Sequence, residues 1–184
     1  MDLTGKILLA MPGMGDPRFE KSVIFMCSHS DEGGMGLIVN KPAVEVGFRK
    51  LLSQLSIEAL SDVPVPEVFL GGPVEHARGF VLHSDEYGAP ETTLRVEGGF
   101  AMTATLDVLE DIARGQGPNA CLLALGYSGW GPGQLEAELA QNAWLVADAS
   151  AQLIFNVDSD DKWAAVLAAM GIDPVTLSGA AGRA

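Results

Sequence analysis

Residues 121–147 read CLLALGYSGWGPGQLEAELAQNAWLVA, and this stretch is the most specific part of the chain. It opens with an apolar run, residues 121–125, that has the length of one buried strand. Gly126 ends that run, and the glycine-rich residues 127–133 predict a loop that carries Trp130. Because Pro132 suits the first turn of a helix, we expect a helix over residues 134–142 and a second strand over 144–147. The stretch therefore predicts strand, loop, short helix and strand, with a large aromatic side chain held on the loop.

Outside this stretch, short apolar runs alternate with turn residues, and strands dominate the first half of the chain. We expect helices over residues 48–55 and 106–113, where apolar residues recur every three or four positions, and a last helix that Ser159 caps. No repeat or linker divides the sequence. The pattern favours a single α+β domain over residues 1–184, with a mixed, largely antiparallel sheet that bends into a partial barrel and is flanked by helices. Further strands are expected at residues 7–11, 22–29, 35–40, 68–70, 79–83, 93–97, 100–102 and 153–155.

The chain is strongly acidic, with 24 acidic residues against 11 basic ones and a formal net charge of −13. The basic residues are scattered and form no stripe, whereas nucleic-acid binding draws much of its affinity from Lys and Arg on phosphates. We therefore expect no direct nucleic-acid binding, and the same charge disfavours anionic membrane surfaces. No apolar run approaches the ~20 residues of a membrane span, and no signal segment opens the chain. These features predict a cytoplasmic protein with no membrane association.

The two cysteines, Cys27 and Cys121, lie inside apolar, strand-like runs. Cysteines in such runs usually behave as small buried hydrophobes. A catalytic thiol needs an exposed, electropositive setting and a nearby base, which neither position offers. We expect two reduced, buried thiols.

The order of several motifs resembles the bacterial YqgE/AlgH family, and the resemblance covers almost the whole chain. The family implies a compact α+β fold with helices around a bent sheet. It implies no established activity, although the family carries a loose label as a transcriptional regulator. The motifs are GYSGW, GQLEAEL and NAWL within residues 126–145, preceded by GKILLAMP (5–12), Phe19, SVI (22–24), His29, GLIVNKP (36–42), GGPV (71–74) and VLH (81–83), and followed by Trp163, GIDP (171–174) and AGRA (181–184).

Motifs for known chemistries are incomplete. Residues 126–130 nearly match the G-x-S-x-G nucleophile elbow around Ser128, but Trp130 replaces the last glycine, and all three histidines precede the serine. The chain has no phosphate-binding loop and no metal-ligand spacing. His29 and His83 each end an apolar strand, which is more typical of a hydrogen-bonded structural histidine than of a ligand. We expect no cofactor and no metal.

Three turn-like segments that follow strands, residues 40–42, 71–73 and 127–134, form a candidate binding surface. If their strands share a sheet and point the same way, the segments would gather at one edge, with aromatic walls and polar groups typical of ligand sites. In the other interpretation the glycines serve backbone geometry and Trp130 belongs to the core. The candidate binding residues are Asn40, Lys41, Gly71, Gly72, Pro73, His83, Tyr127, Ser128, Trp130, Gln134 and Glu138.

The sequence favours a non-enzymatic binding or regulatory module that acts through a protein partner or a small ligand. One alternative is an enzyme of unknown reaction that uses the Trp130 pocket, with Ser128, His83, Asn40 and Glu138 as its polar groups. The other is indirect transcriptional regulation through a partner, which rests on the family label alone. Ligand, partner and oligomeric state are left open.

Overall fold

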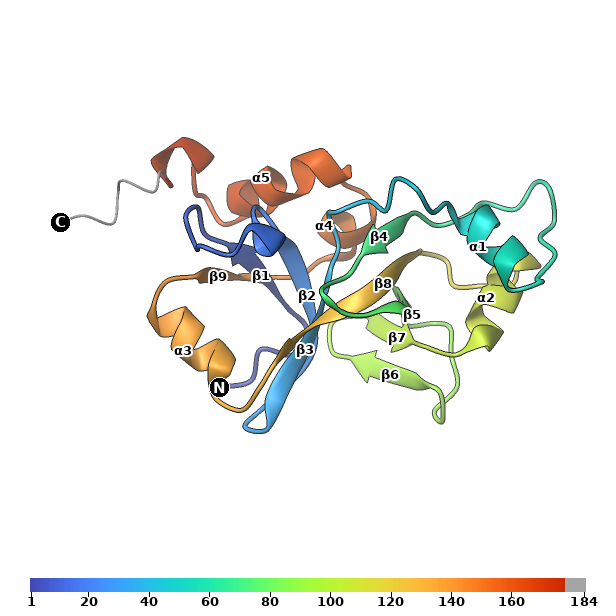
Figure 1. Ribbon diagram of the computed structural model, residues 1–184, viewed down its shortest axis with the longest axis horizontal. Helices are drawn as coiled ribbons and strands as arrows, with labels where there is room; N and C mark the ends of the chain where they lie inside the picture. The colour runs from blue at the N-terminus through green and yellow to red at the C-terminus, as the bar shows by residue number, and fades with distance from the viewer. Residues whose placement is uncertain (178–184) are drawn as a thin grey trace.

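The computed structural model describes residues 1–177, and strand β8 (Cys121–Trp130) runs through the centre of its one curled sheet (Figure 1). The strand order is β6-β7-β5-β8-β3-β2-β1-β9, and neighbours along this path are antiparallel. A further strand, β4, pairs with β8 in parallel. The other strands are β1 (Lys6–Ala10), β2 (Val23–Ser30), β3 (Gly33–Ile38), β4 (Val68–Leu70), β5 (Val74–Ser84), β6 (Thr93–Val96), β7 (Phe100–Thr103) and β9 (Trp144–Asp148).

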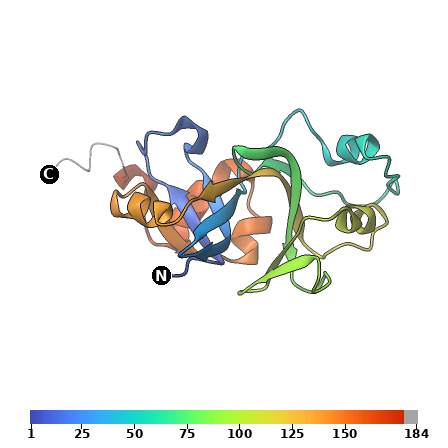
Figure 2. The same ribbon diagram turned by 60° about the horizontal axis from the view of Figure 1, so that its bottom comes forward.

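The helices divide between the two faces of this half-barrel. Helices α4 (Ala151–Phe155) and α5 (Ser159–Ala169) pack into the core cluster on the inner face. On the outer face, α3 (Gln134–Ala140) covers the half that holds β1, β2 and β3, and α1 (Phe48–Gln54) and α2 (Leu106–Ala113) cover the half that holds β5 (Figures 1 and 2). Two short 3-10 helices, η1 (Pro17–Phe19) and η2 (Pro174–Thr176), complete the described residues.

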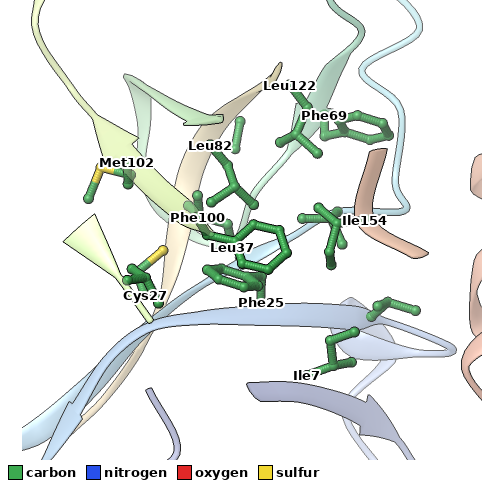
Figure 3. Close-up of a cluster of buried hydrophobic side chains, with 14 of the residues drawn as sticks. Ile7, Phe25, Cys27, Leu37, Phe69, Leu82, Phe100, Met102, Leu122 and Ile154 are labelled. Atoms are coloured by element: carbon green, nitrogen blue, oxygen red, sulfur yellow. The ribbon is translucent and has the colours of Figure 1, made fainter. Parts of the chain in front are cut away.

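Strand β2 shows how the sequence distributes its side chains between these layers. Val23, Phe25 and Cys27 point into the inner cluster, where Figure 3 shows Phe25 beside Phe100 and Leu37. The intervening Ile24 and Met26 belong to the outer cluster that packs against α3. This is the period of two expected of a strand that is buried on both faces. The apolar run of β2 therefore reflects two covered faces rather than one.

The connection from β4 to β5 crosses over the backbone of β8. Leu123 of β8 pairs with Val68 of β4 and with Val81 of β5, so the two strands lie on opposite sides of β8. Residues 71–73 make the whole connection, and Gly71 and Gly72 lie against the backbone of residues 126–127. A Cβ on Gly71 would collide with the carbonyl oxygen of residue 126 and lie 2.9 Å from the Ala124 Cβ. Glycine is required here because two backbones approach within side-chain distance.

The α+β class, the largely antiparallel bent sheet and the positions of helices α1, α2 and α3 confirm the sequence-based expectations. Three local predictions are wrong. Residues 127–130 continue β8 instead of forming a loop, because neighbouring strands pair with them, as Gly129 does with Met35. Residues 153–155 belong to helix α4, whose N-terminus Ser150 caps by accepting from the Leu153 N–H at 3.2 Å. Asp158, rather than Ser159, is the N-cap of α5.

The expected tail at residues 178–184 lies outside the described residues. Within residues 1–177, every helix is too short or too polar to span a bilayer.

Candidate functional site

Trp130 is buried, with 7 % of its surface exposed, so the structure supports the interpretation that places its ring in the core. Its indole packs edge-to-face against that of Trp144, with ring centroids 6.0 Å apart. One carboxylate oxygen of Glu138 accepts from both indole nitrogens, at 3.2 Å from Trp130 and 3.1 Å from Trp144. We call this arrangement the indole bridge. It joins the end of β8 and the start of β9 to α3.

Gln134 supports the indole bridge from the start of α3. Its side-chain oxygen accepts from the Gly131 N–H at 3.0 Å, and its amide donates to the second carboxylate oxygen of Glu138 at 3.3 Å. The side chain therefore fixes the turn between β8 and α3 and orients the carboxylate. Gln134 and Glu138 both serve the fold in this arrangement.

Asn40 and Lys41 continue β3 and bond to neighbouring backbone. The side-chain amide of Asn40 accepts from the Val23 N–H at 2.9 Å and donates to the Lys21 carbonyl at 2.8 Å, as a paired backbone residue of a neighbouring strand would. The Lys41 ammonium donates to the Arg18 carbonyl at 3.1 Å, and partial burial lowers its pKa. These contacts hold the 17–21 segment against the end of β3.

Ser128 is buried inside β8, and its hydroxyl donates to the Gly71 carbonyl at 3.2 Å. That bond ties β8 to the glycines of the crossing. Pro73 follows the crossing directly and is half-buried before β5. The Ser128 hydroxyl thus bonds to a backbone carbonyl, and His29 and His83 bond to other groups, whereas an activated serine is bonded to a base.

His83 is fully buried, and its contact with the Ser84 carbonyl determines its tautomer. Its Nδ1–H donates to the Ser84 carbonyl at 2.8 Å, so Nε2 accepts from the Thr103 hydroxyl, also at 2.8 Å. The Thr103 oxygen lies 2.8 Å from the Thr93 hydroxyl, which donates to it. Burial lowers the pKa of His83. A neutral, fully bonded ring is what the sequence pattern predicted for this residue.

We expect acidification to destabilise the protein through His83. Because the pKa of His83 in the folded state lies below the ordinary 6.5, the unfolded chain binds more protons than the folded protein as the pH falls. The stabilising contribution of the neutral ring is present above pH 6.5 and is lost as the pH falls through the folded-state pKa. Urea unfolding of the wild type and of His83→Gln at pH 7 and pH 5 measures this effect. The wild type should exceed the variant in free energy of unfolding by less at pH 5 than at pH 7.

The matched control for this experiment is His76→Gln, at an exposed histidine, which should keep the wild-type pH dependence. An equal loss of stability between pH 7 and pH 5 in His83→Gln and in the wild type would contradict the assignment to His83.

His29 has a structural role as well. Its Nδ1 accepts from the Leu3 N–H at 3.1 Å, so Nε2 carries the proton and donates to the Glu136 carboxylate at 2.8 Å. The ring thus joins the N-terminal residues to the first turn of α3. Within residues 1–177, no group of three or more His, Cys, Asp and Glu side chains is placed to hold a metal ion.

The thiols are free and poorly reactive. Burial raises the pKa of Cys27 to about 12 and that of Cys121 to about 11. Since the thiolate is the nucleophilic form, neither cysteine is suited to nucleophilic catalysis near neutral pH. This agrees with the expectation of two reduced thiols, although Cys121 is partly exposed.

Tyr127 lines an open groove on the inner face of the half-barrel, which we call the mouth groove. Its lining comes from five strands: Ser28 and Ser30 of β2, Met35 of β3, Phe80 of β5, Met102 of β7, and Tyr127 and Trp130 of β8. The groove has a volume of about 460 Å³. The Phe80 and Tyr127 rings meet edge-to-face with centroids 5.7 Å apart. Neither α4 nor α5 lines this groove, which leaves part of the inner face uncovered.

The structure brings the candidate residues together in two groups and leaves one apart. Asn40, Lys41, Gly71, Gly72, Pro73, Tyr127 and Ser128 surround the crossing, where the Ile38 N–H donates to the Gly71 carbonyl and the Leu70 N–H to the Lys41 carbonyl. Trp130, Gln134 and Glu138 form the second group under α3. His83 pairs with Cys121 at the other end of β8, about 20 Å along the strand from Ser128.

The sequence did not point to the other walls of the mouth groove, Met35, Phe80 and Met102, or to Arg78 at its rim. The Arg78 guanidinium lies over the Phe80 ring, 5.0 Å from its centroid. The available signal is strand alternation, which places each of these apolar residues on the inner face. Strand alternation does not predict that the helices leave this part of the inner face uncovered.

The chain matches a family model, several relatives and solved structures. A family model described as AlgH-like matches residues 7–175. A UPF0301 protein of Ruegeria pomeroyi is 60% identical over 185 residues, and one of Cereibacter sphaeroides is 54% identical over 184 residues; each match covers 100% of both chains. The solution structure of the AlgH protein from Pseudomonas aeruginosa superposes with a TM-score of 0.78 at 37% identity, covering 100% of this chain and 97% of that one. Protein DIP2367 of Corynebacterium diphtheriae shares the fold, with a TM-score of 0.73 at 22% identity over 95% of this chain and 89% of that one.

Proposed function

The chain belongs to the AlgH-like family, and from that premise we propose that it is a non-enzymatic binding module that recognises a protein partner through the mouth groove. The observation that carries the proposal is the uncovered inner face of the half-barrel. Helices α4 and α5 pack on the inner core cluster but do not line this part of the face, where residues from five strands line an open groove of about 460 Å³. Barrel mouths with apolar walls and a few polar groups are common binding sites.

The composition of the groove favours apolar side chains of a partner as its occupant. Met35 and Met102 are flexible and polarisable, so they adapt to differently shaped apolar groups. Phe80 and Tyr127 add aromatic contact area. The exposed rim carries two hydroxyl groups, a carboxylate and a guanidinium, which suit the polar edge of a protein interface; they belong to Ser28, Ser30, Glu32 and Arg78.

The structural contacts of the other candidate residues support a binding module over an enzyme. Ser128, His83, Asn40 and Glu138 would be the polar groups of a reaction, yet each is hydrogen-bonded within the fold. They also do not form one cluster, because Asn40 and Ser128 lie near the crossing, Glu138 lies on α3 and His83 lies at the other end of β8. Indirect transcriptional regulation stays compatible with this proposal, and the identity of the partner would decide it.

Photo-crosslinking in the native bacterium tests the proposal. A photoreactive amino acid at Ser30 or Arg78, on the groove rim, should give a discrete adduct with one protein. The same residue at Val44, which is 92% exposed outside the groove, should not give that adduct. Met35→Gln, combined with the Ser30 probe, should reduce the adduct at least about tenfold if apolar contact contributes ~1.4 kcal/mol. Identical adducts from Ser30 and Val44, or none from the rim positions, would contradict the proposal.

A further inference from the structure

Lys162 of α5 is buried, with 2% of its surface exposed. It lies on the same helix as Val166 and Leu167, which belong to the apolar core. Its amine donates to the Val39 carbonyl at 2.7 Å and to the Ile154 carbonyl at 2.8 Å. The nitrogen lies 5.3 Å from the centroid of the Phe69 ring. A lysine is rarely buried this far unless it is paired, and Lys162 makes no salt bridge within the described residues.

The two carbonyls leave one position of the amine free. A neutral amine has two N–H donors and one lone pair, and an ammonium has three N–H donors. With Val39 and Ile154 each accepting one N–H, the remaining tetrahedral position holds the third N–H of the ammonium or the lone pair of the amine. The geometry therefore accommodates the neutral form without loss of either hydrogen bond.

A cavity adjoins this amine. It has a volume of about 260 Å³, and its lining includes Lys162, the Phe69 ring, Ile154 and Glu67. It adjoins a wider cleft of about 470 Å³, with which it shares Cys121 and Asn156 among its lining residues. A small molecule can therefore approach Lys162 through the cleft between α4 and the loops at 63–66 and 115–120. The mouth groove shares no lining residue with either cavity.

Burial makes the amine less basic than an ordinary lysine. Desolvation lowers the pKa of Lys162 from 10.5 to about 8, and the nearby Glu67 carboxylate opposes part of that shift. With such a pKa about a tenth of the amine is neutral at pH 7, against about 0.03% for an ordinary lysine. Desolvated lysines of this kind act as nucleophiles toward carbonyl compounds.

We propose that Lys162 is a nucleophilic site that forms an imine with a small, uncharged aldehyde that enters through the adjoining cleft. The nitrogen lone pair forms a bond to the aldehyde carbon, the carbon–oxygen bond breaks, and the oxygen leaves as water with the two amine protons. When the imine nitrogen takes up a proton from solvent, its N–H donates to one of the two carbonyls, and Glu67 supplies an opposite charge at the cavity wall. Glu67 and Asp158, which both line the cavity, disfavour anionic aldehydes.

Reductive trapping with propionaldehyde and cyanoborohydride tests the site on the full-length protein. Peptide mapping by mass spectrometry after short exposure at pH 7 should show Lys162 propylated at least about tenfold faster than the exposed Lys21 and Lys50, because more of its amine is neutral. Its rate should rise less steeply above pH 8, where more than half of the amine is neutral, whereas the rate at an ordinary lysine continues to rise. Slower modification of Lys162 than of the exposed lysines would overturn the proposal and leave a purely structural role.

A second variant tests the route to the amine. Asn156 is exposed and lines both cavities, so Asn156→Phe should slow modification of Lys162 severalfold and leave Lys21 and Lys50 unchanged. An unchanged rate at Lys162 in this variant would contradict entry through the cleft. This site is independent of the proposed protein-binding groove, so either proposal can fail without the other.

Discussion

Replacing Glu138 by leucine is expected to lower the free energy of unfolding by about 3–5 kcal/mol, because two buried indole N–H groups lose their common acceptor and each unsatisfied donor costs ~1–3 kcal/mol. Both groups are poorly placed to find water instead, since Trp130 is 7% exposed and Trp144 is 4% exposed. Gln134 also loses its contact with the second carboxylate oxygen. Urea unfolding followed by circular dichroism and tryptophan fluorescence measures the change.

Two variants make this experiment specific to the indole bridge. Glu138→Gln keeps an oxygen that both indoles can share, so it should lose only about 1 kcal/mol, the difference between a charge-assisted and a neutral hydrogen bond. Gln141→Leu, at the exposed end of the same helix, makes a similar polar-to-apolar change without the bridge and should stay within about 0.5 kcal/mol of the wild type. Equal stability of Glu138→Leu and Gln141→Leu would show that the bridge contributes little.

Replacing Gly71 by alanine is expected to destabilise the protein by about 3 kcal/mol or more, because the added methyl group has no space at the crossing. It would meet the carbonyl oxygen of Gly126 and the Cβ of Ala124, and neither can move without disturbing the centre of the sheet. The Ser128 hydroxyl and the Ile38 N–H, which both donate to the Gly71 carbonyl, would lose their geometry as well. Thermal and urea unfolding measure the loss, and a low yield of folded protein would have the same cause.

The matched control is Gly131→Ala in the turn before α3, where the nearest atom to a new Cβ is 3.9 Å away. This variant should be nearly as stable as the wild type, since it makes the same chemical change in open space. If both variants lost the same stability, backbone freedom rather than the crossing would explain the effect, and the close packing of the two backbones would not be the reason for glycine at position 71.

These contacts give the most specific part of the sequence a structural meaning. The spacing of Trp130, Gln134, Glu138 and Trp144 holds α3 on the outer face of the sheet, and the double glycine lets one strand connection pass over another strand. Residues with strict geometric requirements can therefore form a recognisable signature without taking part in a reaction. The proposed binding surface lies on the inner face, where Tyr127 belongs to the GYSGW motif but Met35, Phe80 and Met102 belong to none of the motifs.

The sequence by itself determined the local elements and the fold class. Apolar runs of strand length, the helical period over residues 48–55 and 106–113, and the turn residues between them predicted an α+β domain with a bent, largely antiparallel sheet, as the structure has it. Local periodicity suffices for this, because each element must present its apolar side chains to a core. It failed at residues 127–130, where glycine content suggested a loop and pairing with β3 made a strand.

Only the tertiary structure decided what the candidate residues do. Burial of Trp130, the shared carboxylate of Glu138 and the position of His83 at the far end of β8 depend on contacts between segments that are distant in the chain or turned toward one another by the sheet. The same holds for Lys162, whose hydrogen-bond partner Val39 is 123 positions away. The residue type determines which hydrogen bonds a side chain can make. The folded chain determines which partner lies within reach and whether water is excluded from the contact.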